Sequence, residues 1–256
     1  MVGRGMMRAT QDRVMLDVDD PESFRADLQK LLDAPGVWGQ LQSDVTGDYK
    51  LFHEFADAPK YVTAPLVRTL RADAECVIRS EYASVAVYHS CCPPDRRSYT
   101  ERGLLVTTRE LLLELTHEAF GISHAVDKAF APVCREYLKW YDGTVGLWLT
   151  AYETNGHHKG HFLGTLAANL GKKGQKLLNL HRKKCIPSIV KCSLPLDWLD
   201  RKMRDPAVGR YASATLQRMV LYRAMPKSAQ CDFGALGLRC NVPPEMIIGF
   251  MDTPNK

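Results

Sequence analysis

Three residues that could take part in chemistry lie in or beside apolar runs typical of buried strands. His89 closes the run at 84–89, Trp148 lies within the run at 144–152, and Glu245 follows two prolines. The histidine can be a structural side chain, a metal ligand, a base or a ligand-binding group. A Trp in a buried strand more often packs in the core than on a ligand, and a Glu after two prolines is usually an exposed turn residue.

Three histidines in the segment NGHHKGHF form a second candidate. His157, His158 and His161 could ligate zinc, because positions 157 and 161 share one face of a helix. The segment has no HExxH motif, and no Asp or Glu lies within the next 35 residues. A polar cluster that opens a helix is therefore favoured, and a zinc-dependent hydrolase remains an alternative function.

The eight cysteines include no CxxC pair, and only Cys91 and Cys92 are adjacent. In a chain of 256 residues this pattern favours buried reduced thiols over a disulfide scaffold. Either adjacent thiol could serve as a nucleophile activated by a histidine. The sequence shows no sign of the electropositive surroundings that such a thiolate needs.

Positive charge is concentrated in one window. Residues 154–196 contain eight Lys and Arg and no Asp or Glu, so the rest of the chain, whose total charge is +5, carries −3. This asymmetry indicates either a solvated helix face or a surface that faces phosphate. A nucleic-acid-binding module without catalysis is thus another alternative. The candidate phosphate-binding residues are Lys172, Lys173, Lys176, Arg182, Lys183 and Lys184.

The order of the expected elements indicates an α+β fold. The first 80 residues favour helices, one of them opened by Asp20 and Pro21 and another around 64–72. A further helix is expected at 107–119, opened by Thr107 with Glu110 as a capping box and ended by Gly121. Helices are also expected at 161–170 and 175–183, and strands at 84–89, 144–152, 188–194, 215–224 and 246–251. The regular alternation of a doubly wound sheet is absent, as are the GxGxxG and P-loop motifs.

The composition, with 45% hydrophobic and 25% charged residues, is typical of a globular protein with a sizeable core. No run approaches the roughly 20 apolar residues that cross a bilayer. The N-terminal residues lack the apolar stretch of a signal peptide. The sequence therefore predicts a soluble, cytoplasmic protein with no membrane partner.

Three motifs in order resemble the ADP-ribosyltransferase fold of diphtheria-toxin-like enzymes and poly(ADP-ribose) polymerases. The segments are VYHSC…ERGLL with Gly103 and Leu104, GLWLT, and PPEMIIGF. The resemblance covers 81–256 and implies a split β-sandwich with helical insertions, preceded by a helical segment at 1–80. Trp148 stands where the family has Tyr, and the spacing of the first two motifs requires a helical insertion at about 107–139.

The resemblance implies that NAD is the substrate. Glu245 would stabilise the oxocarbenium-like transition state, an effect on the order of 3 kcal/mol per well-placed group. His89 would hold the adenosine side, and Trp148 would pack on nicotinamide for about 1–3 kcal/mol. The acceptor would be a protein or a nucleic acid, as for a toxin or effector, or water in an NAD glycohydrolase. The further cofactor contacts would be Thr150, Tyr152, His161 and Phe162.

Overall fold

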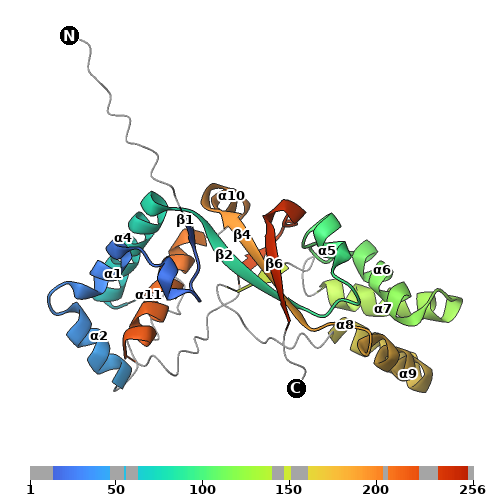
Figure 1. Ribbon diagram of the computed structural model, residues 1–256. Coiled ribbons are helices and arrows are strands. Elements are labelled where there is room, and N and C mark those ends of the chain that lie inside the picture. The colour runs from blue at the N-terminus through green and yellow to red at the C-terminus, as the bar shows by residue number, and fades with distance from the viewer. Residues whose placement is uncertain are drawn as a thin grey trace, which may run out of the picture. The chain divides into compact units, whose positions relative to one another are not determined.

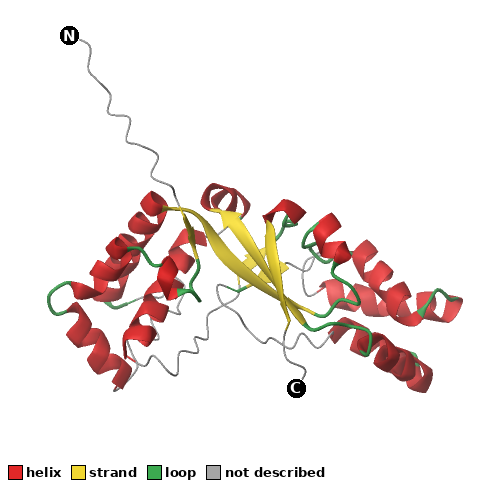
Figure 2. Ribbon diagram, viewed as in Figure 1, coloured by secondary structure: helices red, strands yellow, loops and turns green. Residues whose placement is uncertain are grey.

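The computed structural model describes residues 14–46, 55, 63–139, 147–150, 161–203, 207–224 and 236–252. Helices and two small sheets make it a mixed α+β fold, as the sequence predicts (Figures 1 and 2). Among the described helices, none is long and apolar enough to cross a membrane. Contacts divide the chain into two units, Met1–Ala86 with Ser193–Gly234, and Val87–Cys192 with Ala235–Lys256. The expected boundary between a helical segment at 1–80 and a domain at 81–256 stays a prediction.

The larger sheet has four strands in the order β1-β2-β4-β6 (Figure 2). Their bounds are Val14–Leu16, Tyr82–Cys91, Ser188–Pro195 and Ile247–Asp252. β1 pairs with β2 in parallel, and β4 pairs with β6 in antiparallel fashion. A second sheet pairs β3 (Leu147–Leu149) with β5 (Leu236–Leu238), with Trp148 opposite Gly237.

The strand β2 is buried on both faces, because the consecutive residues Val85, Ala86, Val87 and Tyr88 are all buried. This explains its near-continuous apolar sequence. β2 and β4 each contribute residues to both units, which makes them the shared elements of the fold.

The first unit packs its helices around α4 and α11, which lie against each other. Its helices are α1 (Ala26–Lys30), α2 (Val37–Thr46), α4 (Pro65–Glu81), α10 (Leu196–Lys202), α11 (Ala207–Ala224) and the single turns η1 (Pro21–Ser23) and η2 (Leu31–Asp33). Two tyrosines fix this packing. The Tyr211 hydroxyl donates to the Ala86 carbonyl at 3.0 Å, and the Tyr82 hydroxyl donates to the Ser23 carbonyl at 3.0 Å.

The strand expected at 215–224 is wrong, since these residues belong to the helix α11. Every residue from 211 to 217 is buried, so the helix shows no polar stripe of period 3.6 in its sequence. Thr215, Val220 and Tyr222, within the expected strand, also favour strands locally. The expected helix start at Asp20 is confirmed, and its carboxylate accepts from the Glu22 amide at 3.0 Å, although only one turn follows.

The second unit carries a helical core whose buried side chains include Leu112, Phe120, Phe130 and Leu178. Its helices are α5 (Arg97–Arg102), α6 (Arg109–Phe120), α7 (His124–Lys139), α8 (His161–Asn169), α9 (Gly171–Arg182) and the turn η4 (Pro244–Met246). The helical insertion expected at 107–139 is thus present as α6 and α7.

A capping threonine and a glycine with positive φ set the two ends of α6. Thr108, rather than the expected Thr107, caps it by accepting from the Leu111 amide at 3.3 Å. Gly121, with φ of +77°, ends it as predicted.

A glycine allows the residues after α5 to approach the residues before β6. Gly103 has φ of +77° and ψ of −163°, and Leu104 exchanges two backbone hydrogen bonds with Val242, at 2.9 and 2.8 Å. A Cβ at position 103 would overlap the carbonyl oxygen of Val242. The first and third sequence motifs are therefore joined at a point where only glycine fits.

We expect Gly103→Ala to destabilise the protein more than Gly121→Ala. Both glycines have φ of +77° and extended ψ, so each alanine adds backbone strain of about 1–3 kcal/mol. Only at position 103 does the new Cβ also meet backbone, which adds about 1–3 kcal/mol. Urea unfolding of the two variants measures the difference, and equal losses would contradict the close approach.

Candidate functional site

The structure places the first two sequence motifs side by side. The Tyr88 amide donates to the Thr150 carbonyl at 2.8 Å, and the Thr150 amide donates to the Tyr88 carbonyl at 2.9 Å. The Thr150 hydroxyl adds a bond to the same Tyr88 carbonyl at 3.3 Å. His89 is thus held one residue from a bridge to the segment that contains Trp148.

The two faces of β2 have different surroundings at this point. Tyr88 and Thr150 stand directly opposite each other, so their side chains share one face, and His89 points to the other. The Lys191 ammonium lies 5.5 Å from the centre of the Tyr88 ring, on the face opposite His89. Thr150 therefore contributes to strand pairing, and its side chain does not adjoin the half-buried His89.

The face of His89 is shared by a cluster that sequence reasoning missed. Cys91, two residues further along β2, accepts a side-chain hydrogen bond from Tyr99 of α5. The Tyr99 ring meets the Phe250 ring edge-on at 6.2 Å, and the Arg96 guanidinium lies 5.3 Å from the same ring. This cluster fixes α5 against β6.

Arg96 also connects the start of β4 with the end of β6, which are paired in the sheet. Its guanidinium donates to the Ser188 hydroxyl at 2.8 Å and forms an ion pair with Asp252. In the sequence, the only local signal was the run PPDRR, which marks a turn. The partners of Arg96 are more than ninety positions away, so only the fold could identify them.

Glu245 lies in the exposed turn η4, directly before the edge strand β6. The sequence predicted such a position near a rim. β6 begins just after Glu245, and its first residue pairs with Cys192 near the end of β4. His89 lies toward the start of β4, because the Ile186 amide donates to the Pro93 carbonyl at 2.8 Å. Glu245 and His89 therefore lie toward opposite ends of the sheet, on either side of β4.

Phe162 has a packing role. Its ring is 5% exposed and lies 6.0 Å from the Phe130 ring and 5.2 Å from the Tyr137 ring. These contacts account for the aromatic side chain without a ligand, and we do not retain it among the cofactor contacts.

Several expected site residues lie outside what the structure describes. Tyr152, His157 and His158 lie outside the described residues, and at Trp148 and His161 only the backbone is described. Within the described part of the chain, no group of three His, Cys, Asp or Glu side chains could hold a metal ion. The zinc-dependent hydrolase therefore stays a prediction that depends on residues 157 and 158.

The less exposed thiols around the end of β2, Cys91, Cys185 and Cys192, are not poised as nucleophiles. Burial raises the pKa of Cys91 to about 11 and that of Cys192 to about 12. Burial and a hydrogen bond with Cys92 raise the pKa of Cys185 to about 11. A catalytic thiolate requires a lowered pKa, so the interpretation of Cys91 as a nucleophile is not supported.

The comparisons with known proteins yielded no relative. No protein-family model, curated protein or solved structure matches the chain.

We expect iodoacetamide at pH 8 to modify Cys92 and Cys76, which are exposed, well before Cys91 or Cys192. A thiol with a pKa of about 11 is ionised in only about one molecule in a thousand at this pH. Peptide mass spectrometry over time measures each site, with urea-unfolded protein as the control. Rapid labelling of Cys91 in the folded protein would contradict its burial.

Proposed function

We propose that the protein cleaves NAD and transfers ADP-ribose to a macromolecular acceptor. The observation that carries this proposal is the pair of backbone bridges, Tyr88 with Thr150 and Leu104 with Val242. They bring segments from all three motifs together within one unit, although the motifs are far apart in the sequence. Such an arrangement is what a site assembled from the three motifs requires.

The two main candidates have separate roles in the proposal. His89 hydrogen-bonds the adenosine ribose, whereas Glu245 acts at the ribose that carries nicotinamide. These riboses stand on either side of a pyrophosphate, and the two residues lie toward opposite ends of the sheet, so NAD would have to extend along β4 to reach both.

Glu245 is suited to the chemical step. Loss of nicotinamide leaves positive charge on the ribose in an oxocarbenium-like transition state, as in glycoside hydrolysis. A carboxylate beside this ribose stabilises the charge and accepts a hydrogen bond from a ribose hydroxyl. The exposed position of Glu245 leaves its carboxylate accessible to a ligand. Arg96 supports the site indirectly, because its bonds to Ser188 and Asp252 hold the strand that follows the glutamate.

We expect purified protein to release nicotinamide from NAD, and Glu245→Gln to lower kcat on the order of 100-fold. The amide keeps the shape of the side chain but removes the charge that stabilises the transition state. Nicotinamide is quantified by chromatography, with protein, RNA and DNA as acceptors. Glu136→Gln, at an exposed glutamate of α7, is the matched control.

The products of the same assay distinguish transfer from hydrolysis. Radiolabel from the ADP-ribose moiety in an acceptor supports a transferase, and free ADP-ribose alone identifies an NAD glycohydrolase. If no acceptor leads to nicotinamide release and NAD does not raise the melting temperature, the proposed function is wrong.

We expect His89→Ala to raise KM for NAD about tenfold, with a smaller change in kcat. The proposed contact holds the adenosine ribose equally in ground state and transition state, so its loss weakens uniform binding. Steady-state kinetics separates the two constants, and His124→Ala in the exposed first turn of α7 serves as the control. A change in kcat alone would assign His89 to the chemical step instead.

A further inference from the structure

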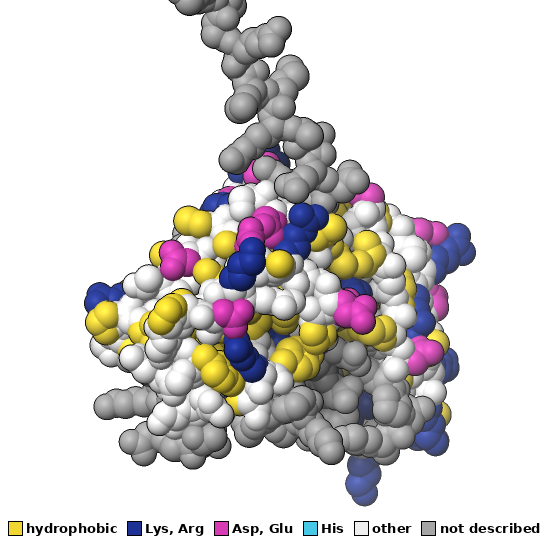
Figure 3. Space-filling model, turned by 60° about the vertical axis from the view of Figure 1, so that its left-hand side comes forward, with side chains coloured by type: hydrophobic (Ala, Val, Ile, Leu, Met, Phe, Trp, Pro, Cys, Tyr) yellow, Lys and Arg dark blue, Asp and Glu magenta, His cyan; other side chains and the backbone are white. Residues whose placement is uncertain are grey.

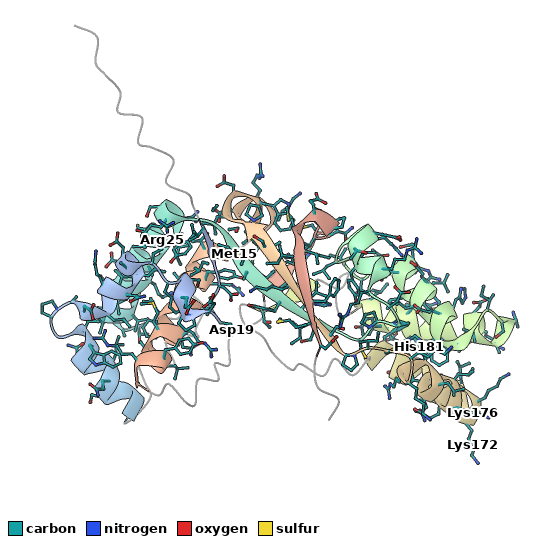
Figure 4. All side chains as sticks on the ribbon, in the orientation of Figure 1. Met15, Asp19, Arg25, Lys172, Lys176 and His181 are labelled. Atoms are coloured by element: carbon teal, nitrogen blue, oxygen red, sulfur yellow. The ribbon has the colours of Figure 1, made fainter. Side chains whose placement is uncertain are left out.

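The helix α9 and the turn after it carry six exposed cations, which we call the α9 basic face. They are Lys172, Lys173, Lys176, Arg182, Lys183 and Lys184. Lys172, Lys176 and Lys183 lie within about 40° of one another around the helix axis. Figure 4 shows Lys172 and Lys176 extending from the end of α9 away from the neighbouring helices.

These cations lie on, or directly after, a helix whose sequence contains no Asp or Glu. Within the described residues, no carboxylate forms an ion pair with any member of the α9 basic face. Elsewhere, Arg79 pairs with Glu75 and Asp200, and Arg102 pairs with Glu114. On the face shown in Figure 3, basic and acidic side chains are likewise interspersed. The positive charge of the α9 basic face is therefore available to an external partner.

The apolar side of α9 is already covered. Leu178 is buried in the helical core, and Gly174 lies so close to α8 that an added Cβ would meet the Ala167 carbonyl oxygen at 2.7 Å. On the outer side, Leu180 is the one strongly exposed apolar residue of this helix. A helix that enters a lipid interface needs a wide apolar face free to insert, and α9 has none available.

The dimensions of the face match a double helix. From Lys172 to Arg182 the helical rise spans about 15 Å, and a duplex presents about nine phosphate charges over that length. The segment 171–184 contains no Phe, Tyr or Trp on which unpaired bases could stack. Phosphate contacts without stacking favour a duplex over a single strand.

We propose that the α9 basic face binds the phosphate backbone of double-stranded nucleic acid without reading its sequence. The last residues of the face lie near the end of β2 that carries His89. The Ile186 amide, just beyond the face, donates to the carbonyl of Pro93, just beyond β2, at 2.8 Å. The binding itself does not depend on the proposed NAD chemistry. If the protein does transfer ADP-ribose, the duplex is the class of acceptor that this surface would bind.

The test is fluorescence anisotropy of a labelled 20-base-pair DNA duplex, titrated with full-length protein between 50 and 200 mM salt. Six phosphate contacts give a slope of log affinity against log salt of about −5. The variant Lys172→Ala/Lys176→Ala/Lys183→Ala lowers the magnitude of this slope by about 3 and weakens binding tenfold or more. Circular dichroism verifies that the variant is folded.

The matched control removes the same charge from another helix. Lys128→Ala/Arg135→Ala/Lys139→Ala affects exposed cations of α7, which also carries Asp127 and Glu136, and leaves binding within about threefold. Equal losses in the two triple variants, or no binding to the duplex, would overturn the proposal. Stronger binding to a single strand or to anionic phosphatidylserine vesicles than to the duplex would also overturn it. Glu245→Gln keeps full binding, so a failure of the catalytic proposal and a failure of this one are distinguishable.

Discussion

The fold depends on the pairing of the backbone groups of β2. Four consecutive buried residues, 85–88, have amides and carbonyls that water cannot reach, so each needs a partner in the protein. β1 pairs with the first half of the strand, β4 is its neighbour in the sheet, and Thr150 pairs with Tyr88 in the second half. This requirement brings segments from three other regions of the sequence to one strand.

Side-chain hydrogen bonds then attach the surrounding elements. The hydroxyls of Tyr82 and Tyr211 each satisfy a distant backbone carbonyl in the first unit. In the second unit, Arg96 satisfies Ser188 and stacks on Phe250. Because the two tyrosine bonds are buried or partly buried, loss of either hydroxyl would remove a hydrogen bond from its carbonyl, at a cost of about 1 kcal/mol. Together with the apolar packing, these hydrogen bonds determine which elements pack against each other.

The two functional proposals draw on different properties of the second unit. The catalytic proposal relies on backbone bridges that gather the motifs near one sheet, with a glutamate at its rim and a histidine on an inner strand. The binding proposal relies on charge, because six cations on α9 lack the ion pairs found elsewhere. A polyanionic acceptor would connect the two, since the end of the basic helix leads to the end of β2.

Features that depend only on neighbouring residues were predictable from the sequence. These include the stop of α6 at Gly121, the buried run of β2, the strand before Pro195, the exposed turn at Glu245 and the window without acids. Only the tertiary structure decided that 215–224 is helical, because burial on all sides removes the periodicity that identifies a helix. It likewise decided the strand β1, the core role of Phe162 and the partners of Arg96. Each of these results from contacts between residues far apart in the chain, and local propensity and spacing carry no information about such contacts.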